Sequence, residues 1–206
     1  MTNAIGQAFP QNYSKISEAT SSAGFTMASD ALTCSFLRTL AASKLSGKFL
    51  ELGTGTGLST SWILDGMDAC SSLVSIDNDH AFLGIAKTFL GSDPRLDLLC
   101  VDGGSWVKDN LQKRFDYIFA DTWHGKYLLL DEVLSMVKVG GFYIIDDMLP
   151  QPNWPEGHEE KAANLISYLD EREDFLLTRQ VWATGIIVAV KIEARGVVHE
   201  QNQGRN

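Results

Sequence analysis

The segment ELGTGTGLST, residues 51–60, places a carboxylate directly before a glycine-rich turn. Its alternating glycines are Gly53, Gly55 and Gly57. Glycines let a backbone approach a ligand closely, although a tight strand-to-helix turn without a ligand would also use them. The G-x-G-x-x-G dinucleotide pattern fails here, because Leu58 or Thr60 stands where its third glycine is required. Since Glu51 would repel a pyrophosphate, the segment argues against a nicotinamide dehydrogenase and favours a cationic ligand.

Acidic residues also follow later apolar runs of the sequence. Asp77 follows LVSI, Asp121 follows FDYIFA, and Asp146 with Asp147 follows FYII. Because parallel strands present their carboxyl ends at one edge of a sheet, we expect these carboxylates to lie close together. Simpler uses stay open: Asp79 is the better candidate to cap a helix near His80, while Asp146 could brace a turn and Asp147 could be solvated.

These residues must be positioned by alternating strands and helices. The predicted strands are 49–52, 73–76, 96–101, 115–120, 142–145, 175–182 and 185–192. The predicted helices begin near Asp30, Ser59, His80, Ser105, Lys126 and Glu159, with Ser29 or Asp30 as the first cap. This alternation predicts an α/β fold with a mostly parallel seven-stranded sheet and helices on both faces. The short link at 183–185 predicts an antiparallel C-terminal hairpin.

Length, charge and composition limit the class of protein. The chain has 206 residues and a net charge of −9, which fits one soluble domain and argues against a nucleic-acid partner. The organisation predicted is a lead-in at 1–28, a domain at 29–192 and a polar tail at 193–206. Three distant cysteines, no membrane-length apolar run and no signal-peptide pattern predict a cytoplasmic protein. The apolar helix from Asp30 could pack against a second copy as a homodimer.

The order E-x-G-x-G-x-G, then Asp77 in LVSIDND, then CVDGG resembles the class I S-adenosylmethionine-dependent methyltransferases. The resemblance implies a Rossmann-like methyltransferase fold in which the glycine loop meets the methionine part and ribose of the cofactor. It also implies that Asp77 holds the ribose hydroxyls and that the third strand end lies beside the adenine. The cofactor-binding residues implied are Met27, Glu51, Gly53, Thr54, Gly55, Gly57, Ser59, Asp77, Asn78, Asp102, Gly103, Asp121 and Trp123.

The segments FDYIFADTWHGKY and GGFYIIDDMLP are similar to the catechol-type, cation-dependent O-methyltransferases. That branch implies a divalent cation such as Mg²⁺, which would hold the substrate hydroxyls. The metal ligands it implies are Asp121, Asp146 and Asp147. Oxygen ligands suit Mg²⁺, and clustered carboxylates repel one another without a cation or proton. The resemblance further implies that Trp123 lies beside the adenine and that FTMAS at 25–29 lines the cofactor.

Three departures limit what can be transferred from that branch. The family's basic lysine falls on His124, with Lys126 two residues later, and the family's amide falls on Asp147. The glutamate that orients a catechol falls on Ile187, so we do not expect a catechol substrate. The predicted catalytic residues are His124, Asp121 and Asp146, with His124 or Lys126 as the base, while the metal is left open.

The loop PQPNWPEGH, residues 150–158, follows the fifth predicted strand and contains three prolines. Proline fixes the backbone, so the loop is stiff and would lie over the carboxyl edge of the sheet. We predict that Trp154 and His158 line the pocket for the methyl acceptor, although a rigid loop without a ligand has equal support.

The function predicted is therefore methyl transfer from S-adenosylmethionine to a hydroxyl of a small molecule, by in-line displacement. The alternatives are a methyltransferase-fold protein that binds the cofactor without catalysis, and an RNA or protein methyltransferase. The retained titratable cluster weighs against the first alternative, and the acidic balance weighs against the second.

Overall fold

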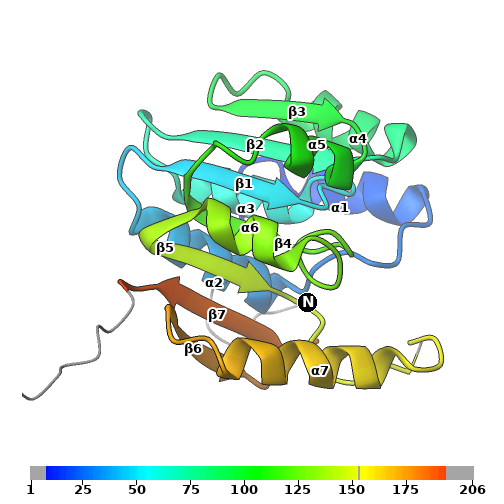
Figure 1. Cartoon of the computed structure of the whole chain (residues 1–206). Coiled ribbons are helices and arrows are strands. Elements are labelled where there is room, and N and C mark those ends of the chain that lie inside the picture. Colours follow the sequence, from blue (N-terminus) through cyan, green and yellow to red (C-terminus); the bar gives the residue numbers. More distant parts are fainter. Residues whose placement is uncertain (1–7, 153, 194–206) are drawn as a thin grey trace, which may run out of the picture.

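The protein is described by a computed structural model over residues 8–152 and 154–193. A seven-stranded sheet in the order β3-β2-β1-β4-β5-β7-β6 forms its centre, with helices on both sides (Figure 1). The strands are β1 (Lys48–Leu52), β2 (Ser72–Asp77), β3 (Leu96–Cys100), β4 (Phe115–Ala120), β5 (Val137–Ile145), β6 (Phe175–Gln180) and β7 (Ile186–Lys191). The helices are α1 (Tyr13–Ser22), α2 (Ala31–Ala42), α3 (Leu58–Gly66), α4 (His80–Leu90), α5 (Gly103–Asp109), α6 (Leu130–Met136) and α7 (His158–Asp170).

The strand directions confirm the predicted fold class. Strands β1 to β5 pair in parallel, and β7 runs antiparallel to both β5 and β6. Since consecutive parallel strands are joined by helices, the carboxyl ends of β1, β2, β4 and β5 share one edge. The C-terminal hairpin is β6–β7, as the short link predicted.

The central strands are buried on both faces, which explains their nearly continuous apolar runs. Along β1 and β4 the side chains alternate between two core clusters, Phe49 and Tyr117 in one and Leu50 and Ile118 in the other. The first cluster packs under α1, α2, α3 and α4, and the second under α5, α6 and α7. The two helical layers therefore hold the strand ends rigidly at the site edge.

The loop after β4 differs from the prediction. A helix was expected from near Lys126, but α6 begins at Leu130. Residues 122–129 instead form a compact turn in which the N–H of Tyr127 and of Leu128 donate to the carbonyl of Trp123, at 2.9 and 3.0 Å. The residues of this segment are common in helices, but the hydrogen bonds of the turn hold them in a non-helical conformation up to Leu129.

The predicted lead-in contains a helix that packs on the domain. Ile16 of α1 is fully buried in the core beneath α2, α3 and α4. The side-chain amide of Asn12 donates to the carbonyl of Phe89 at the end of α4, at 2.8 Å. Residues 1–7 of the lead-in and 194–206 of the tail lie outside the described part of the chain.

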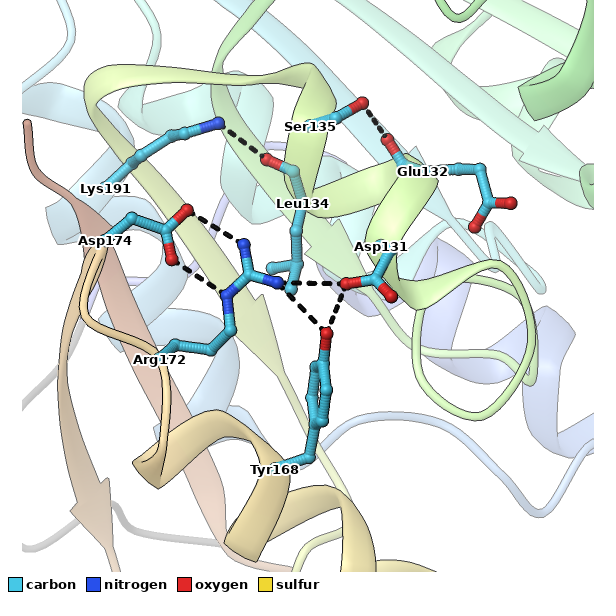
Figure 2. Close-up of polar contacts among 8 residues, drawn as sticks. All are labelled: Asp131, Glu132, Leu134, Ser135, Tyr168, Arg172, Asp174 and Lys191. Atoms are coloured by element: carbon cyan, nitrogen blue, oxygen red, sulfur yellow. Dashed lines mark hydrogen bonds and ion pairs between the residues drawn. The ribbon is translucent and has the colours of Figure 1, made fainter. Parts of the chain in front are cut away.

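A polar network joins α6, α7 and the start of β6, as Figure 2 shows. The Arg172 guanidinium donates to both carboxylate oxygens of Asp174 at 2.8 Å and to Asp131 of α6 at 3.0 Å. The Tyr168 hydroxyl of α7 donates to the same oxygen of Asp131. Lys191 of β7 also donates to the carbonyl of Leu134 at 3.1 Å, so α6 and the hairpin hold each other in place.

Within the described ranges, no helix combines the length and apolar character that a membrane span requires.

Candidate functional site

The glycine loop lies at the carboxyl edge of the sheet, between β1 and α3. The N–H groups of Gly53 and Thr54 both donate to the carbonyl of Ile76, at 2.9 and 3.1 Å, which fastens the loop to β2. A Cβ at Gly53 would lie 2.7 Å from the carbonyl oxygen of Asp121, so a side chain there would clash with backbone. The loop is therefore held between the ends of β2 and β4.

Asp77 ends β2 beside the glycine loop. Its Oδ2 accepts the N–H of Gly55 at 2.7 Å, and its Oδ1 accepts the N–H of Asp79 at 2.8 Å. As predicted, Asp79 is the residue that caps α4, through the N–H groups of Ala81 and Phe82. The Asp77 carboxylate is thus free of a capping role, and each oxygen keeps a further lone pair as an acceptor.

Glu51 does not reach the cavity, which corrects the prediction that it contacts the cofactor. Its side chain is fully buried beneath the loop and accepts hydroxyl hydrogen bonds from Ser59, Thr60 and Ser75 at 2.5–2.6 Å. Burial raises its pKa to about 7, against the lowering effect of these donors. Glu51 therefore braces the first turn of α3 against β2, and its charge does not face a ligand.

A cavity of about 660 Å³ runs along the carboxyl edge of the sheet. From the glycine loop, the end of β2 and the N-terminal segment, predicted residues line it: Met27, Gly53, Thr54, Gly55, Ser59, Asp77 and Asn78. From the ends of β4 and β5 and the loops around them come Asp121, Trp123, Lys126, Tyr127, Asp146, Asp147, Trp154, His158 and Thr184. The structure thus brings most of the predicted site residues into one hollow.

A smaller cavity of about 260 Å³ adjoins the first and shares Asp77 and Trp123 with it. Gly103 and His124 line only this smaller cavity. The His124 ring lies against the start of α5, since a Cβ at Gly104 would be 2.7 Å from its Nε2. The predicted role of His124 as the base is therefore not supported by its position.

Two more predicted cofactor residues line neither cavity. Gly57 precedes α3 and packs against α4, where a Cβ would lie 2.9 Å from that of Ala86. Asp102 caps α5 by accepting the N–H of Ser105 at 2.8 Å. Gly57 therefore lets α3 and α4 pack closely, and Asp102 caps α5. The sequence motif alone could not distinguish these structural roles from contact with a ligand.

Three carboxylates meet where β4 and β5 end. Ala120 and Ile145 are paired neighbours, so Asp121 and Asp146, which follow them, emerge side by side. Burial and the charge of Asp121 raise the pKa of Asp146 to about 7, and the same two causes raise the pKa of Asp147. The Asp146 Oδ1 accepts the hydroxyl of Thr184 at 2.7 Å and the N–H of Asp147 at 2.8 Å.

A lysine ammonium lies within this carboxylate group. The Nζ of Lys126 is 3.3 Å from Oδ1 of Asp121, and the Lys126 side chain is 6% exposed. The hydroxyl of Ser29 donates to the other oxygen of Asp121 at 3.0 Å. Both carboxylate oxygens of Asp121 are therefore engaged by the protein itself.

With the Lys126 ammonium in place, the predicted metal ligands do not fit a divalent cation. Across 8–152 and 154–193, no three side chains of His, Cys, Asp or Glu are placed to hold a metal ion together. The predicted set of Asp121, Asp146 and Asp147 is therefore corrected: Lys126 and Ser29 engage the first, and Thr184 binds the second.

Aromatic side chains form a wall of the cavity around His158. The imidazole is tilted against the ring of Trp154, with the centroids 4.5 Å apart, and meets Trp123 edge to face at 5.8 Å. Its Nε2 is 3.3 Å from the hydroxyl of Tyr127. Burial, followed by the charges of Lys161 and Lys126, lowers the pKa of His158 and so favours the neutral ring. The predicted pair of Trp154 and His158 thus lies at the cavity.

Sequence reasoning missed how several residues serve the site. Ser29 was considered as a helix cap, but Asp30 caps α2 and Ser29 binds Asp121. Thr184 lies in the hairpin link, where no motif marks it. Lys126 was predicted only as an alternative base. A helix was expected to begin at Lys126, so the turn that directs its side chain into the cavity was not predicted.

Residues 50–148 match the family model of a methyltransferase domain. No curated protein matches this chain. An O-methyltransferase from Bacillus cereus, solved in complex with SAH, is 17% identical, with a TM-score of 0.76 over 92% of this chain and 93% of that one. The O-methyltransferase TomG from Streptomyces achromogenes, involved in tomaymycin synthesis and solved with SAM, is 20% identical, with a TM-score of 0.74 over 90% and 92%. An SAH-bound methyltransferase from Podospora anserina is 16% identical, with a TM-score of 0.76 over 91% and 90%. The chain therefore has the fold of these methyltransferase structures, and its residues 50–148 resemble the methyltransferase domain of the family model.

Proposed function

We propose that the protein transfers a methyl group from S-adenosylmethionine to a hydroxyl group of a small molecule. One observation carries the proposal: a single cavity joins the glycine loop and Asp77 to a group of carboxylates, a lysine and aromatic rings. The methyltransferase-domain match supports the reaction class. Structures with the same fold that hold SAM or SAH, two of them named O-methyltransferases, support the cofactor and the oxygen acceptor.

The cofactor fits the part of the cavity beside the glycine loop. The bare backbone of Gly53 and Gly55 permits close approach of the methionine portion, and the free lone pairs of Asp77 can accept both ribose hydroxyls. Trp123 and Asn78 line both cavities and would enclose the adenine. S-adenosylmethionine supplies a methyl group on a sulfonium, and this chain supplies alignment and a dry surrounding.

The acceptor oxygen attacks the methyl carbon in line with the carbon–sulfur bond, whose electron pair stays with sulfur. The hydroxyl proton must leave at the same time, and Asp146 is the group that receives it. Its Oδ1 is occupied by Thr184 and Asp147, while no donor within the described residues binds its Oδ2. A carboxyl group whose pKa is raised to about 7 is well matched to proton transfer near neutral pH.

The aromatic wall indicates the shape of the acceptor. The ring centroid of His158 lies 4.5–5.8 Å from those of Trp123, Tyr127 and Trp154. Such a wall binds a planar ring by stacking, so a phenolic hydroxyl is the acceptor class that fits best.

The predicted homodimer and cytoplasmic location stay predictions, which light scattering and localisation of the tagged protein would check.

The test combines calorimetry with a turnover assay. We expect S-adenosylmethionine and S-adenosylhomocysteine to bind with micromolar affinity and NAD not to bind. With a panel of phenols, S-adenosylhomocysteine should accumulate in step with a methylated product. Asp146→Asn should lower kcat by about 100-fold or more while leaving cofactor affinity within twofold. Binding of NAD in place of S-adenosylmethionine, or methylation of nitrogen alone, would overturn the proposal.

A further inference from the structure

The ion pair of Lys126 and Asp121 lies just after the end of β4, where both residues line the main cavity. Lys126 is 5% exposed, and its ammonium lies 3.3 Å from Asp121 and lines the main cavity. An ammonium has three N–H donors, and hydrogen bonding within the described residues uses one of them. The other two are available to a ligand in the cavity.

The turn after β4 is built to carry this side chain inward. Gly125 has a left-handed backbone, with φ of 87°, and its N–H donates to the carbonyl of Leu128 at 2.7 Å. A Cβ at Gly125 would lie 2.9 Å from the Leu52 side chain. The turn therefore packs against the end of β1, and Lys126, the next residue, lines the cavity.

Three carboxylates surround Lys126, and a positive charge among them would reduce their mutual repulsion. Asp121, Asp146 and Asp147 lie on adjacent strand ends, and like charges so close repel one another. The Lys126 ammonium lies 3.3 Å from Asp121 and lines the same cavity as Asp146 and Asp147. The protein therefore places its own positive charge where the carboxylates converge.

We propose that the Lys126 ammonium takes the place of a divalent cation in this site and that the protein needs no metal for methyl transfer. One N–H holds Asp121, and another donates to the acceptor oxygen as negative charge develops on it. Lys126 thus orients the acceptor hydroxyl and stabilises its oxyanion, and Asp146 receives the proton. This inference rests on the proposed function for its catalytic part, but its metal-binding part does not.

The first measurement needs no turnover. Mn²⁺ is titrated into the full-length protein, into Lys126→Met and into Lys126→Arg, with bound Mn²⁺ followed by electron paramagnetic resonance. We expect no binding to the wild type or to Lys126→Arg up to millimolar Mn²⁺. Lys126→Met should bind Mn²⁺, because its carboxylates lose their internal cation while a side chain of similar length keeps the space filled. Equal binding by wild type and Lys126→Met, or equal absence of binding, would overturn the inference.

The second measurement follows turnover in EDTA and in Mg²⁺. The wild type should react at the same rate in both, and Lys126→Met should lose about 100-fold in kcat/KM, in the range expected for one lost oxyanion donor. Lys126→Arg should stay within about tenfold of wild type, because it keeps the charge. Loss of wild-type activity in EDTA with recovery in Mg²⁺ would overturn the inference. Should no acceptor be methylated at all, the proposed function fails, and the Mn²⁺ titration still decides the role of Lys126.

Discussion

The hydroxyl of Tyr143 donates a hydrogen bond to the backbone carbonyl of Gly125, so strand β5 holds the turn that carries Lys126. Tyr143 is fully buried, and burial raises its pKa, so the phenol stays a neutral donor at every working pH. One side chain in the sheet core thus helps to position a cavity residue through the backbone of the preceding Gly125.

Tyr143→Phe should loosen this turn. The Gly125 carbonyl would be left without its donor in a buried place, at a cost of about 1–2 kcal/mol in the free energy of unfolding. Under conditions where the variant is folded, kcat/KM should fall about tenfold, because Lys126 loses its fixed position. Tyr117→Phe is the matched control. The buried hydroxyl of Tyr117 donates to the backbone carbonyl of Leu37, at 3.3 Å, and not to the turn. Urea unfolding and kcat/KM are measured for both, and equal turnover in the two variants would contradict the argument.

The sequence could predict the edge of the sheet where the site lies, because strand ends and glycine turns depend on local chemistry. Asp77 and Asp121 were expected at this edge because each follows a strand, and both line the cavity. The inward turn of Lys126 could not be predicted, because it depends on Tyr143 and Leu52, which are distant in sequence. Glu51 shows the opposite limit: a motif residue was expected at the ligand, and burial made it a brace.

Asp77→Ala should weaken cofactor binding by more than its loss of two backbone hydrogen bonds lowers stability. The variant removes the acceptor of the Gly55 N–H at 2.7 Å and the carboxylate proposed to hold the ribose. We expect the Kd for S-adenosylmethionine to rise at least tenfold, the loss of one charge-assisted hydrogen bond of about 1.5–3 kcal/mol. Asp97→Asn, an exposed carboxylate on the edge strand β3, is the control and should bind as wild type. Unchanged affinity in Asp77→Ala would place the cofactor elsewhere.

Glu51 should make the protein less stable as the pH rises toward 7. The pKa of Glu51 is about 7 in the folded state, against the ordinary value of 4.5 that applies to the unfolded chain. Between these two pH values the folded state holds a proton that the unfolded state releases. The stability it contributes is fully present below about pH 4.5 and is lost as the pH rises through 7, by up to about 1.4 kcal/mol per unit. Glu51→Gln should flatten that slope in urea unfolding between pH 5 and 8, while Glu18→Gln, at an exposed position, should keep it. A steeper slope in Glu51→Gln would show that Glu51 is ionised in the fold.

Arg172 should stabilise the packing of α6 against the C-terminal hairpin. Its guanidinium is 26% exposed and binds Asp174 with two hydrogen bonds and Asp131 with one. Arg172→Ala should lower the free energy of unfolding by about 1–2 kcal/mol, more than an isolated surface pair would. Arg179→Ala, which breaks one more exposed pair with Asp170, should cost less than about 1 kcal/mol. Both are compared by thermal unfolding, and equal losses would mean that the network adds nothing beyond single pairs.

Trp154 should act on the acceptor and leave the cofactor alone. Its ring contacts the His158 ring in the aromatic wall, with the centroids 4.5 Å apart, while Asp77 and the glycine loop belong to other elements of the cavity. Trp154→Ala should therefore raise the KM of a phenolic acceptor about tenfold or more, and the Kd of S-adenosylmethionine should stay within twofold. Trp154→Phe keeps an aromatic face and should recover most of the loss, which a purely structural role of the loop would not require. If both constants weaken together in Trp154→Ala, the wall does not separate acceptor from cofactor, and the assignment of the loop at 150–158 to the acceptor fails.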